Sequence, residues 1–110
     1  MGIPVVYSPD SLEDLENIRS YISEVLCNPA ASLDITGKIL RGIDSLSDSP
    51  ELGPRISARF GILTDYRYLV IGKYLVVYRY TRKDVRVIRV FNGRQDYLKK
   101  LFPESGSDPE

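Results

Sequence analysis

Arginine, lysine, tyrosine and carboxylate side chains are the groups with which this chain could do chemistry. Its 110 residues include no histidine and one cysteine, Cys27. That composition excludes Ser-His-Asp and Cys-His triads, an imidazole general base, and zinc clusters of imidazole or thiolate ligands. The glycine-rich phosphate-binding motifs of nucleotide-binding proteins are also missing from the sequence. We therefore expect no metal ion and no cofactor.

The charged residues are segregated along a chain of zero net charge. Residues 1–54 carry three Lys/Arg against nine Asp/Glu, net −6, whereas residues 55–102 carry 12 against three, net +9. Residues 103–110 add three acids, net −3. This segregation favours an acidic or polyanionic partner for the basic half. The alternative is that acidic helices lie against a basic sheet and neutralise it.

The basic half contains three runs of β-branched and aromatic residues, which favour strands. The runs are Arg67–Ile71, Tyr74–Tyr80 and Val85–Phe91. Gly72-Lys73 suits a type II′ hairpin turn, which requires a positive φ at glycine. Residues 81–84 suit a four-residue loop. The sequence therefore predicts three consecutive antiparallel strands.

The two turns fix the pairing register of these strands. Arg67 then pairs with Tyr78, Tyr78 with Val87 and, in a regular hairpin, Val77 with Ile88. Because side chains alternate between faces, one face is apolar through its middle and needs a cover of helices: Tyr68, Val70, Leu75, Val77, Ile88 and Val90. The opposite face mixes tyrosine and arginine with aliphatic residues and is the expected working surface: Arg67, Leu69, Ile71, Tyr74, Val76, Tyr78, Tyr80, Val87, Arg89 and Phe91.

The same register places two like charges opposite each other. Arg79 of the second run pairs with Arg86 of the third, near the end of the sheet and on the side of the helices. Directly opposed like charges destabilise a sheet. We therefore expect an acidic neighbour, either from the helices or from a bound partner.

The acidic half predicts a short edge strand, Ile3–Tyr7, followed by an antiparallel helical hairpin. Ser8-Pro9 and Asn28-Pro29 each combine an N-cap residue with proline at the first helical position. Apolar residues then recur at helical spacing: Leu12, Leu15, Ile18, Ile22, Val25 and Leu26 in the first helix, and Ile35, Ile39, Ile43 and Leu46 in the second. This hairpin is the natural cover for the apolar face of the sheet.

These elements predict one α+β domain over residues 1–102. It comprises an N-terminal strand, an antiparallel helical hairpin packed on a three- to four-stranded antiparallel sheet, and a short C-terminal helix near Tyr97–Phe102. Residues 48–64 form a long loop of the kind that is often functional, and residues 103–110 form a polar tail. No apolar run approaches the roughly 18 residues of a membrane span, and the N-terminus lacks a signal pattern. The lone cysteine is typical of a reducing cytoplasm.

Five ordered pieces of sequence carry a family resemblance. They are Ser8-Pro9 with Asp14-Leu15, Ile18 and Tyr21-Ile22; Asn28-Pro29-x-Ala31; Leu46-x-x-x-Pro50-x-x-Gly53; Arg67-x-Leu69 with Tyr74-x-Val76-x-Tyr78-Arg79; and Val87-x-x-Val90-Phe91-x-Gly93-Arg94-Gln95-Asp96-Tyr97. Together they resemble the RelE/ParE toxin superfamily of type II toxin–antitoxin systems. The resemblance covers nearly the whole chain and implies the fold described above.

Within that superfamily the long helical hairpin is more similar to the ParE-type toxins. That branch is known for poisoning DNA gyrase and lacks the nuclease residues. Leu69 and Leu75 stand where RelE-type enzymes carry basic residues, and Asn92 stands where many relatives carry histidine. The resemblance therefore implies a toxin that binds a target, DNA gyrase, and is neutralised by a cognate antitoxin.

The candidate binding surface for target or antitoxin consists of five residues on the mixed face and the turn after it: Arg67, Tyr78, Arg89, Asn92 and Arg94. Three of them have a structural alternative. Tyr78 could be core, Arg89 could pair with an acid, and Arg94 could brace the turn through Asp96. An antitoxin segment is expected to mask this basic region, and DNA is expected to be contacted only through the antitoxin complex.

Two other functions remain open. A ribosome-dependent mRNA endonuclease would use Arg67 and Arg94 to stabilise the charge on a phosphorane, with Tyr78 or Tyr97 stacking on a base or assisting proton transfer. An unperturbed tyrosine is a poor base at neutral pH. An inactive relative would only bind the antitoxin.

Overall fold

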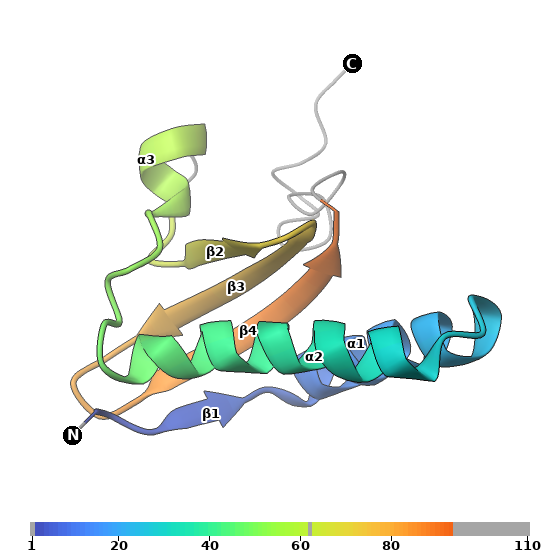
Figure 1. The fold of residues 1–110 in the computed structure, drawn as a ribbon. Helices are drawn as coiled ribbons and strands as arrows, with labels where there is room; N and C mark the ends of the chain where they lie inside the picture. The colour runs from blue at the N-terminus through green and yellow to red at the C-terminus, as the bar shows by residue number, and fades with distance from the viewer. Residues whose placement is uncertain (1, 62, 94–110) are drawn as a thin grey trace, which may run out of the picture.

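The computed structural model describes residues 2–61 and 63–93 of the chain. Its elements follow the order β1 (Val5–Tyr7), α1 (Pro9–Ser20), a π turn η1 (Tyr21–Val25), α2 (Pro29–Asp44), a 3₁₀ turn η2 (Ser45–Ser47), α3 (Ile56–Phe60), β2 (Arg67–Ile71), β3 (Tyr74–Tyr80) and β4 (Val85–Asn92). The predicted α+β fold is confirmed (Figure 1). The predicted C-terminal helix, Arg94, Tyr97 and the polar tail lie outside the described residues.

The four strands form one sheet in the order β1-β4-β3-β2. β2, β3 and β4 are antiparallel neighbours as expected. β1 pairs with β4 in parallel, so the sheet is mixed rather than wholly antiparallel. As Pro4 indicated, β1 lies at an edge, and β2 forms the other edge.

The register of the first hairpin is as predicted, from Arg67 opposite Tyr78 to Ile71 opposite Tyr74. Gly72 in its turn has a φ of 61°, the conformation that glycine adopts without steric strain.

The second hairpin starts in the predicted register, with Tyr78 opposite Val87, but shifts by one residue at Ile88. Val77 therefore lies opposite Arg89 and not opposite Ile88, and Tyr74 opposite Asn92 and not opposite Phe91. This β-bulge reverses the alternation of the residues that follow it.

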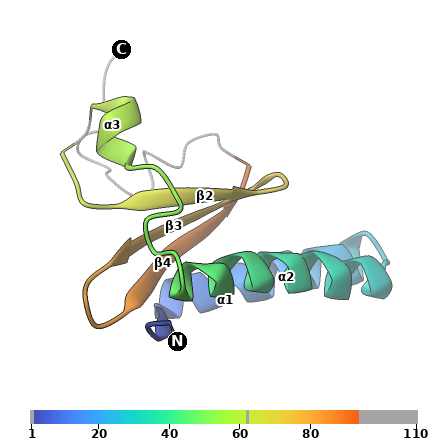
Figure 2. The same ribbon diagram turned by 60° about the vertical axis from the view of Figure 1, so that its left-hand side comes forward.

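The helices cover the face that we expected to be the working surface, so the face assignment was wrong. Figures 1 and 2 show α1 and α2 on one side of the sheet and α3 on the other. Ile18, Ile22, Ile39 and Ile43 of the hairpin pack against Tyr74, Val76, Val87 and Val90, with Leu69 and Ile71 beside them. Alternation separates the two sets of side chains but does not say which set the helices cover. The aliphatic centre of the mixed face is what the hairpin buries.

The second face of the sheet has a smaller core of its own. Ile56 of α3 packs there against Leu75, Val77 and Phe91, with Tyr66, Tyr68 and Ile88 beside them. The long segment after α2, expected to be a loop, thus contains a short helix that brings Ile56 onto the sheet. Five residues are too few for helical periodicity to reveal.

Both predicted helix starts are confirmed. The Ser8 hydroxyl accepts a hydrogen bond from the Ser11 amide at 3.0 Å, and the Asn28 side chain accepts one from Ala31 at 3.1 Å. Ser8 also fastens α1 to the bulge in β4, because its hydroxyl donates to the Ile88 carbonyl at 2.7 Å. The first helix is therefore capped and tied to the sheet by the same side chain.

Candidate functional site

Tyr78 is fully buried and holds the long segment after α2 against the sheet. Its hydroxyl donates to the Pro50 carbonyl at 2.7 Å and accepts from the Gly53 amide at 2.9 Å. Gly53 comes so close to β2 that a Cβ there would overlap the Tyr68 carbonyl oxygen. Burial raises the pKa of Tyr78. Tyr78 is therefore part of the core, the alternative to a place on the binding surface.

Arg89 is paired with an acid, which is the structural role that the sequence analysis gave as the alternative to binding. Its Nε and Nη2 atoms donate to the two carboxylate oxygens of Asp14 in α1, at 2.8 and 2.9 Å. The same carboxylate accepts a hydrogen bond from the Val90 amide at 2.9 Å. These hydrogen bonds to Asp14 raise the pKa of Arg89. The bidentate pair joins α1 to the strand just beyond the bulge.

Asn92 ends β4 and is exposed. The amide of the next residue, Gly93, donates to the Lys73 carbonyl at 2.8 Å and so ties the end of the strand to the first hairpin turn. Arg94, the fifth candidate, follows directly and lies outside the described residues. Of the four candidates that the structure describes, Tyr78 is buried and Arg89 is paired with an acid, so they do not form one exposed surface with Arg67 and Asn92.

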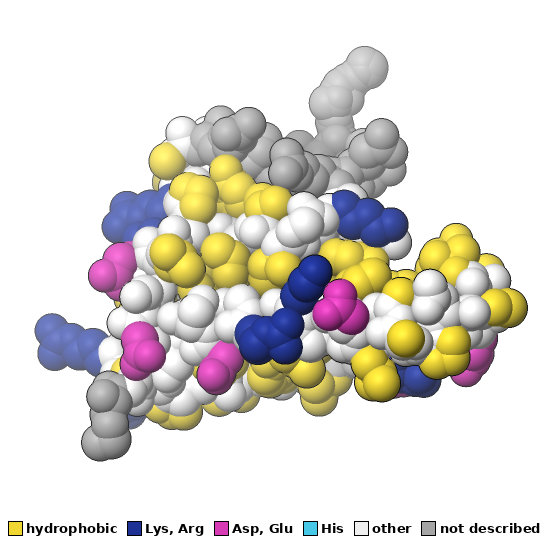
Figure 3. All heavy atoms as spheres, viewed as in Figure 1, with side chains coloured by type: hydrophobic (Ala, Val, Ile, Leu, Met, Phe, Trp, Pro, Cys, Tyr) yellow, Lys and Arg dark blue, Asp and Glu magenta, His cyan; other side chains and the backbone are white. Residues whose placement is uncertain are grey.

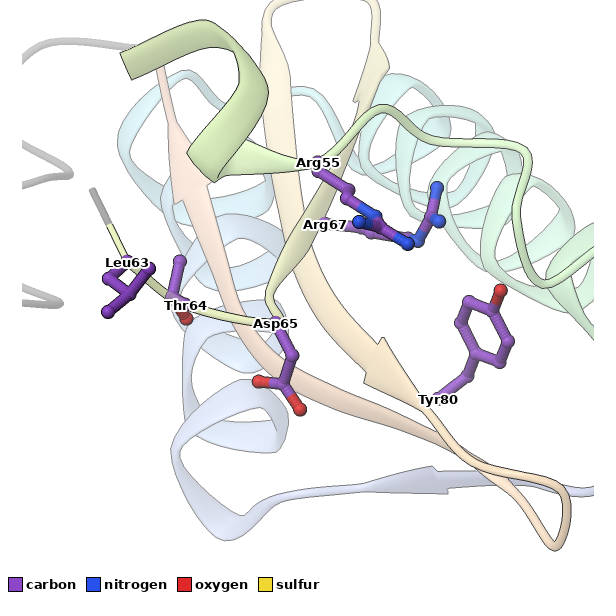
Figure 4. Close-up of a pocket in the computed structure, with 6 residues that line it drawn as sticks. All are labelled: Arg55, Leu63, Thr64, Asp65, Arg67 and Tyr80. Carbon is purple, nitrogen blue, oxygen red and sulfur yellow. The ribbon is translucent and has the colours of Figure 1, made fainter. Parts of the chain in front are cut away.

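Arg67 lies at a cavity of about 580 Å³ beside the edge strand β2. The cavity is lined by Arg55, Leu63, Thr64, Asp65, Arg67 and Tyr80. Arg67 donates through Nη1 to the Gly53 carbonyl at 2.7 Å, and its guanidinium carbon is 5.3 Å from the centroid of the Tyr80 ring. In Figure 4 the side chains of Arg55 and Arg67 extend toward each other and toward Tyr80. This cavity brings two arginines together around one of the predicted site residues.

A second basic cavity of about 510 Å³ lies at the β3–β4 loop, lined by Arg79, Thr81, Arg82, Lys83, Asp84 and Arg86. Arg79 and Arg86 do oppose each other, and each has an acidic neighbour as predicted, but the predicted source of these acids, the helices or a bound partner, was wrong. Asp65 lies 2.9 Å from Arg79, and Asp84 lies 3.3 Å from Arg86. Both acids come from the loops that flank the strands, and neither comes from the helices.

The free end of the helical hairpin carries exposed apolar side chains that the sequence placed in the core or passed over. In Figure 3 hydrophobic side chains gather at this end, at the right of the molecule. Tyr21, Val25, Leu26 and Leu33 there are each about half exposed or more. Helical spacing predicted an apolar stripe through Val25 and Leu26, but the helices extend past the sheet that was to cover it. Exposed apolar groups of this kind mark protein interaction sites.

Among residues 2–61 and 63–93, no group of three or more potential metal-ligating side chains could hold a metal ion. Within the same residues, no helix combines the length and the apolar character needed to cross a membrane.

Comparison with known proteins places this geometry in a family. The family model described as the ParE toxin of the type II toxin–antitoxin system parDE matches residues 5–97. The chain belongs to the ParE toxin family. The solved structure of a chromosomal ParDE toxin–antitoxin system from P. aeruginosa matches with a TM-score of 0.70 at 16% identity, over 84% of this chain and 97% of that chain. No curated protein sequence matches.

In this ParE-family chain, Arg55 and Tyr80 were not named as candidates from the sequence. Arg55 was visible as a cation in the long segment after α2, but its position depends on a β-bridge to Arg67. No local sequence pattern predicts an isolated β-bridge between a loop residue and a strand. The net charge of +9 over residues 55–102 was the available signal, and it did not identify individual residues.

Proposed function

We propose that this chain is a toxin that inhibits growth by binding DNA gyrase, and that a cognate antitoxin neutralises it. The observation that carries the proposal is the match of the ParE toxin family over residues 5–97. The absence of histidine from the sequence agrees with a protein that acts by binding. We place its action in the cytoplasm, where DNA gyrase works.

One member of the candidate nuclease set, Tyr78, is committed to structural contacts, which favours binding over RNA cleavage. The Tyr78 hydroxyl has both a donor and an acceptor partner in the backbone, and burial raises its pKa. A tyrosine whose pKa is raised is a weaker general base near neutral pH. Leu69 and Leu75, where RelE-type enzymes carry basic residues, pack in the two cores.

Two surfaces suit a protein partner. The hairpin end presents Tyr21, Val25, Leu26 and Leu33, and burial of exposed apolar side chains drives protein association. The basic cavity at Arg55 and Arg67 suits acidic side chains. A target and an antitoxin could therefore use different faces of the molecule.

Expression of the chain alone in a bacterial host tests this function through two outputs. We expect arrested growth with filamentous cells and a DNA-damage response, while messenger RNA stays intact. Rapid loss of translation with cut messenger RNA would contradict gyrase binding and favour the endonuclease. Normal growth at verified soluble expression would favour an inactive relative that only binds antitoxin.

A further inference from the structure

Arg55 and Arg67 oppose each other directly across a single β-bridge. The bridge is flanked by hydrogen bonds from the Ile56 amide to the Tyr66 carbonyl, 3.0 Å, and from the Tyr68 amide to the Pro54 carbonyl, 3.1 Å. Arg55 and Arg67 are therefore a non-hydrogen-bonded pair, the arrangement in which opposed side chains stand closest. Like charges placed this way repel each other.

The two guanidinium groups retain unused hydrogen-bond donors. Arg67 uses Nη1 for the Gly53 carbonyl and, at 3.4 Å, for the Glu51 carbonyl. A guanidinium has five N–H donors, and no described residue accepts a hydrogen bond from the Nε or Nη2 group of Arg67, so these groups are available to a ligand. Among the described residues, the exposed Arg55 side chain forms no hydrogen bond or ion pair. Arg67 is thus held in place while one edge of its guanidinium stays open.

Among the residues that the structure describes, no acid lining the cavity neutralises this pair. Asp65 lines the same cavity, but its carboxylate lies 2.9 Å from Arg79. Figure 4 shows the Asp65 carboxylate directed away from Arg55 and Arg67. The cavity therefore contains two close cations whose repulsion a bound anion would relieve.

We propose that the cavity formed by Arg55, Arg67 and Tyr80 binds a carboxylate from an acidic segment of a protein partner. Guanidinium groups bind carboxylates through paired, charge-assisted hydrogen bonds. The Tyr80 ring beside Arg67 supplies an apolar surface for the methylene groups of a glutamate. That the partner is the antitoxin rests on the proposed function; that the site binds a carboxylate does not.

The surroundings of the cavity favour a protein carboxylate over a nucleic acid. The backbone carbonyl of the exposed Glu51 lies 3.4 Å from Arg67 Nη1, and the exposed Asp65 lines the cavity. A chain of phosphates passing through the cavity would meet both acids. A single carboxylate between the two arginines would avoid them.

Binding of a fluorescein-labelled peptide of alternating glutamate and serine to the purified full chain tests the site. A peptide with glutamine in place of glutamate and an oligouridylate of equal length serve as comparisons. Arg55→Gln removes one guanidinium that holds no other described residue, and Arg55→Lys keeps the charge without the paired donors. Arg82→Gln is the matched control, because Arg82 is also exposed and belongs to the other basic cavity.

We expect the glutamate peptide to bind the native chain, and Arg55→Gln to weaken binding about tenfold, the effect of roughly one charge-assisted hydrogen bond. Arg55→Lys should recover only part of this loss, and Arg82→Gln should change binding by less than about twofold. Circular dichroism verifies that each variant is folded.

Four results would overturn the site: no binding of the glutamate peptide, equal binding of the glutamine peptide, equal losses with Arg55→Gln and Arg82→Gln, or tighter Arg55-dependent binding of the oligouridylate. None of these measurements uses toxicity. A chain that binds the peptide through Arg55 but leaves growth unaffected would contradict the proposed function and leave the carboxylate site standing.

Discussion

At the scale of single residues, one hydroxyl group joins the long segment after α2 to the sheet. The Tyr78 hydroxyl is the acceptor for the Gly53 amide and the donor to the Pro50 carbonyl. Tyr78→Phe should lower the free energy of unfolding by about 1–3 kcal/mol, because it leaves a buried amide without a partner. Urea denaturation measures the change.

Tyr80→Phe is the matched control for that substitution. Tyr80 lies two residues along the same strand, and among the described residues its hydroxyl makes no hydrogen bond. We expect its removal to change stability by less than about 0.5 kcal/mol. Equal losses for the two variants would show that the Tyr78 hydroxyl does not hold the loop.

Buried tyrosines also predict how stability depends on pH. Burial raises the pKa of Tyr7, Tyr74 and Tyr78. Above about pH 10 the unfolded chain loses tyrosine protons that the folded chain retains. Stability should therefore be unaffected by these groups below about pH 9 and fall as the pH rises above about 10, less steeply in Tyr78→Phe. Denaturation at a series of alkaline pH values checks this, and stability that rises over that range would contradict it.

The sequence identified Tyr78, Arg67 and Arg89 as noteworthy side chains but did not reveal their partners. Tyr78 bonds to Gly53, Arg67 to the same glycine and Arg89 to Asp14, each far away in the chain. Such partners depend on how elements pack in three dimensions. By contrast, the caps at Ser8 and Asn28 could be predicted because their partners lie three residues away.

At the scale of elements, the two helix caps are expected to contribute unequally. Ser8 caps α1 and also donates to the Ile88 carbonyl at the bulge, whereas Asn28 caps only an exposed helix start. We expect Ser8→Ala to destabilise the protein by about 1–2 kcal/mol and Asn28→Ala by about 0.5–1 kcal/mol. Thermal or urea unfolding of both variants checks the order, which a larger loss for Asn28→Ala would contradict.

The bulge in β4 is the point at which the predicted strand register fails. The first hairpin was predictable throughout because the Gly72-Lys73 turn sets its register. The second hairpin slips at Ile88, where Ser8 and Asp14 of α1 bond to the Ile88 carbonyl and the Val90 amide. Those bonds come from a helix about 75 residues earlier, so no local pattern in β4 marks the bulge. The bulge places Arg89 opposite Val77, where a regular hairpin would have placed it opposite Val76.

At the scale of the whole molecule, the acidic helices and the basic sheet region do not simply neutralise each other. Among the described residues, one ion pair joins the helical hairpin to the sheet, that of Asp14 with Arg89. The other paired arginines of the sheet, Arg79 and Arg86, bind acids from loops. Arg55, Arg67, Arg82 and Lys83 form no ion pair within the same part of the chain. The charge pattern therefore favours an acidic or polyanionic partner for the basic half over neutralisation of the sheet by the helices.

Inhibition of DNA supercoiling by the purified chain tests the central claim most directly. Relaxed plasmid, ATP and DNA gyrase are incubated with increasing amounts of the protein, and plasmid topology is followed on a gel, with the heat-unfolded chain as control. Binding to gyrase predicts a dose-dependent loss of supercoiling by the folded chain. Full supercoiling at a large excess of folded protein, together with cut messenger RNA when ribosomes are supplied, would contradict the account.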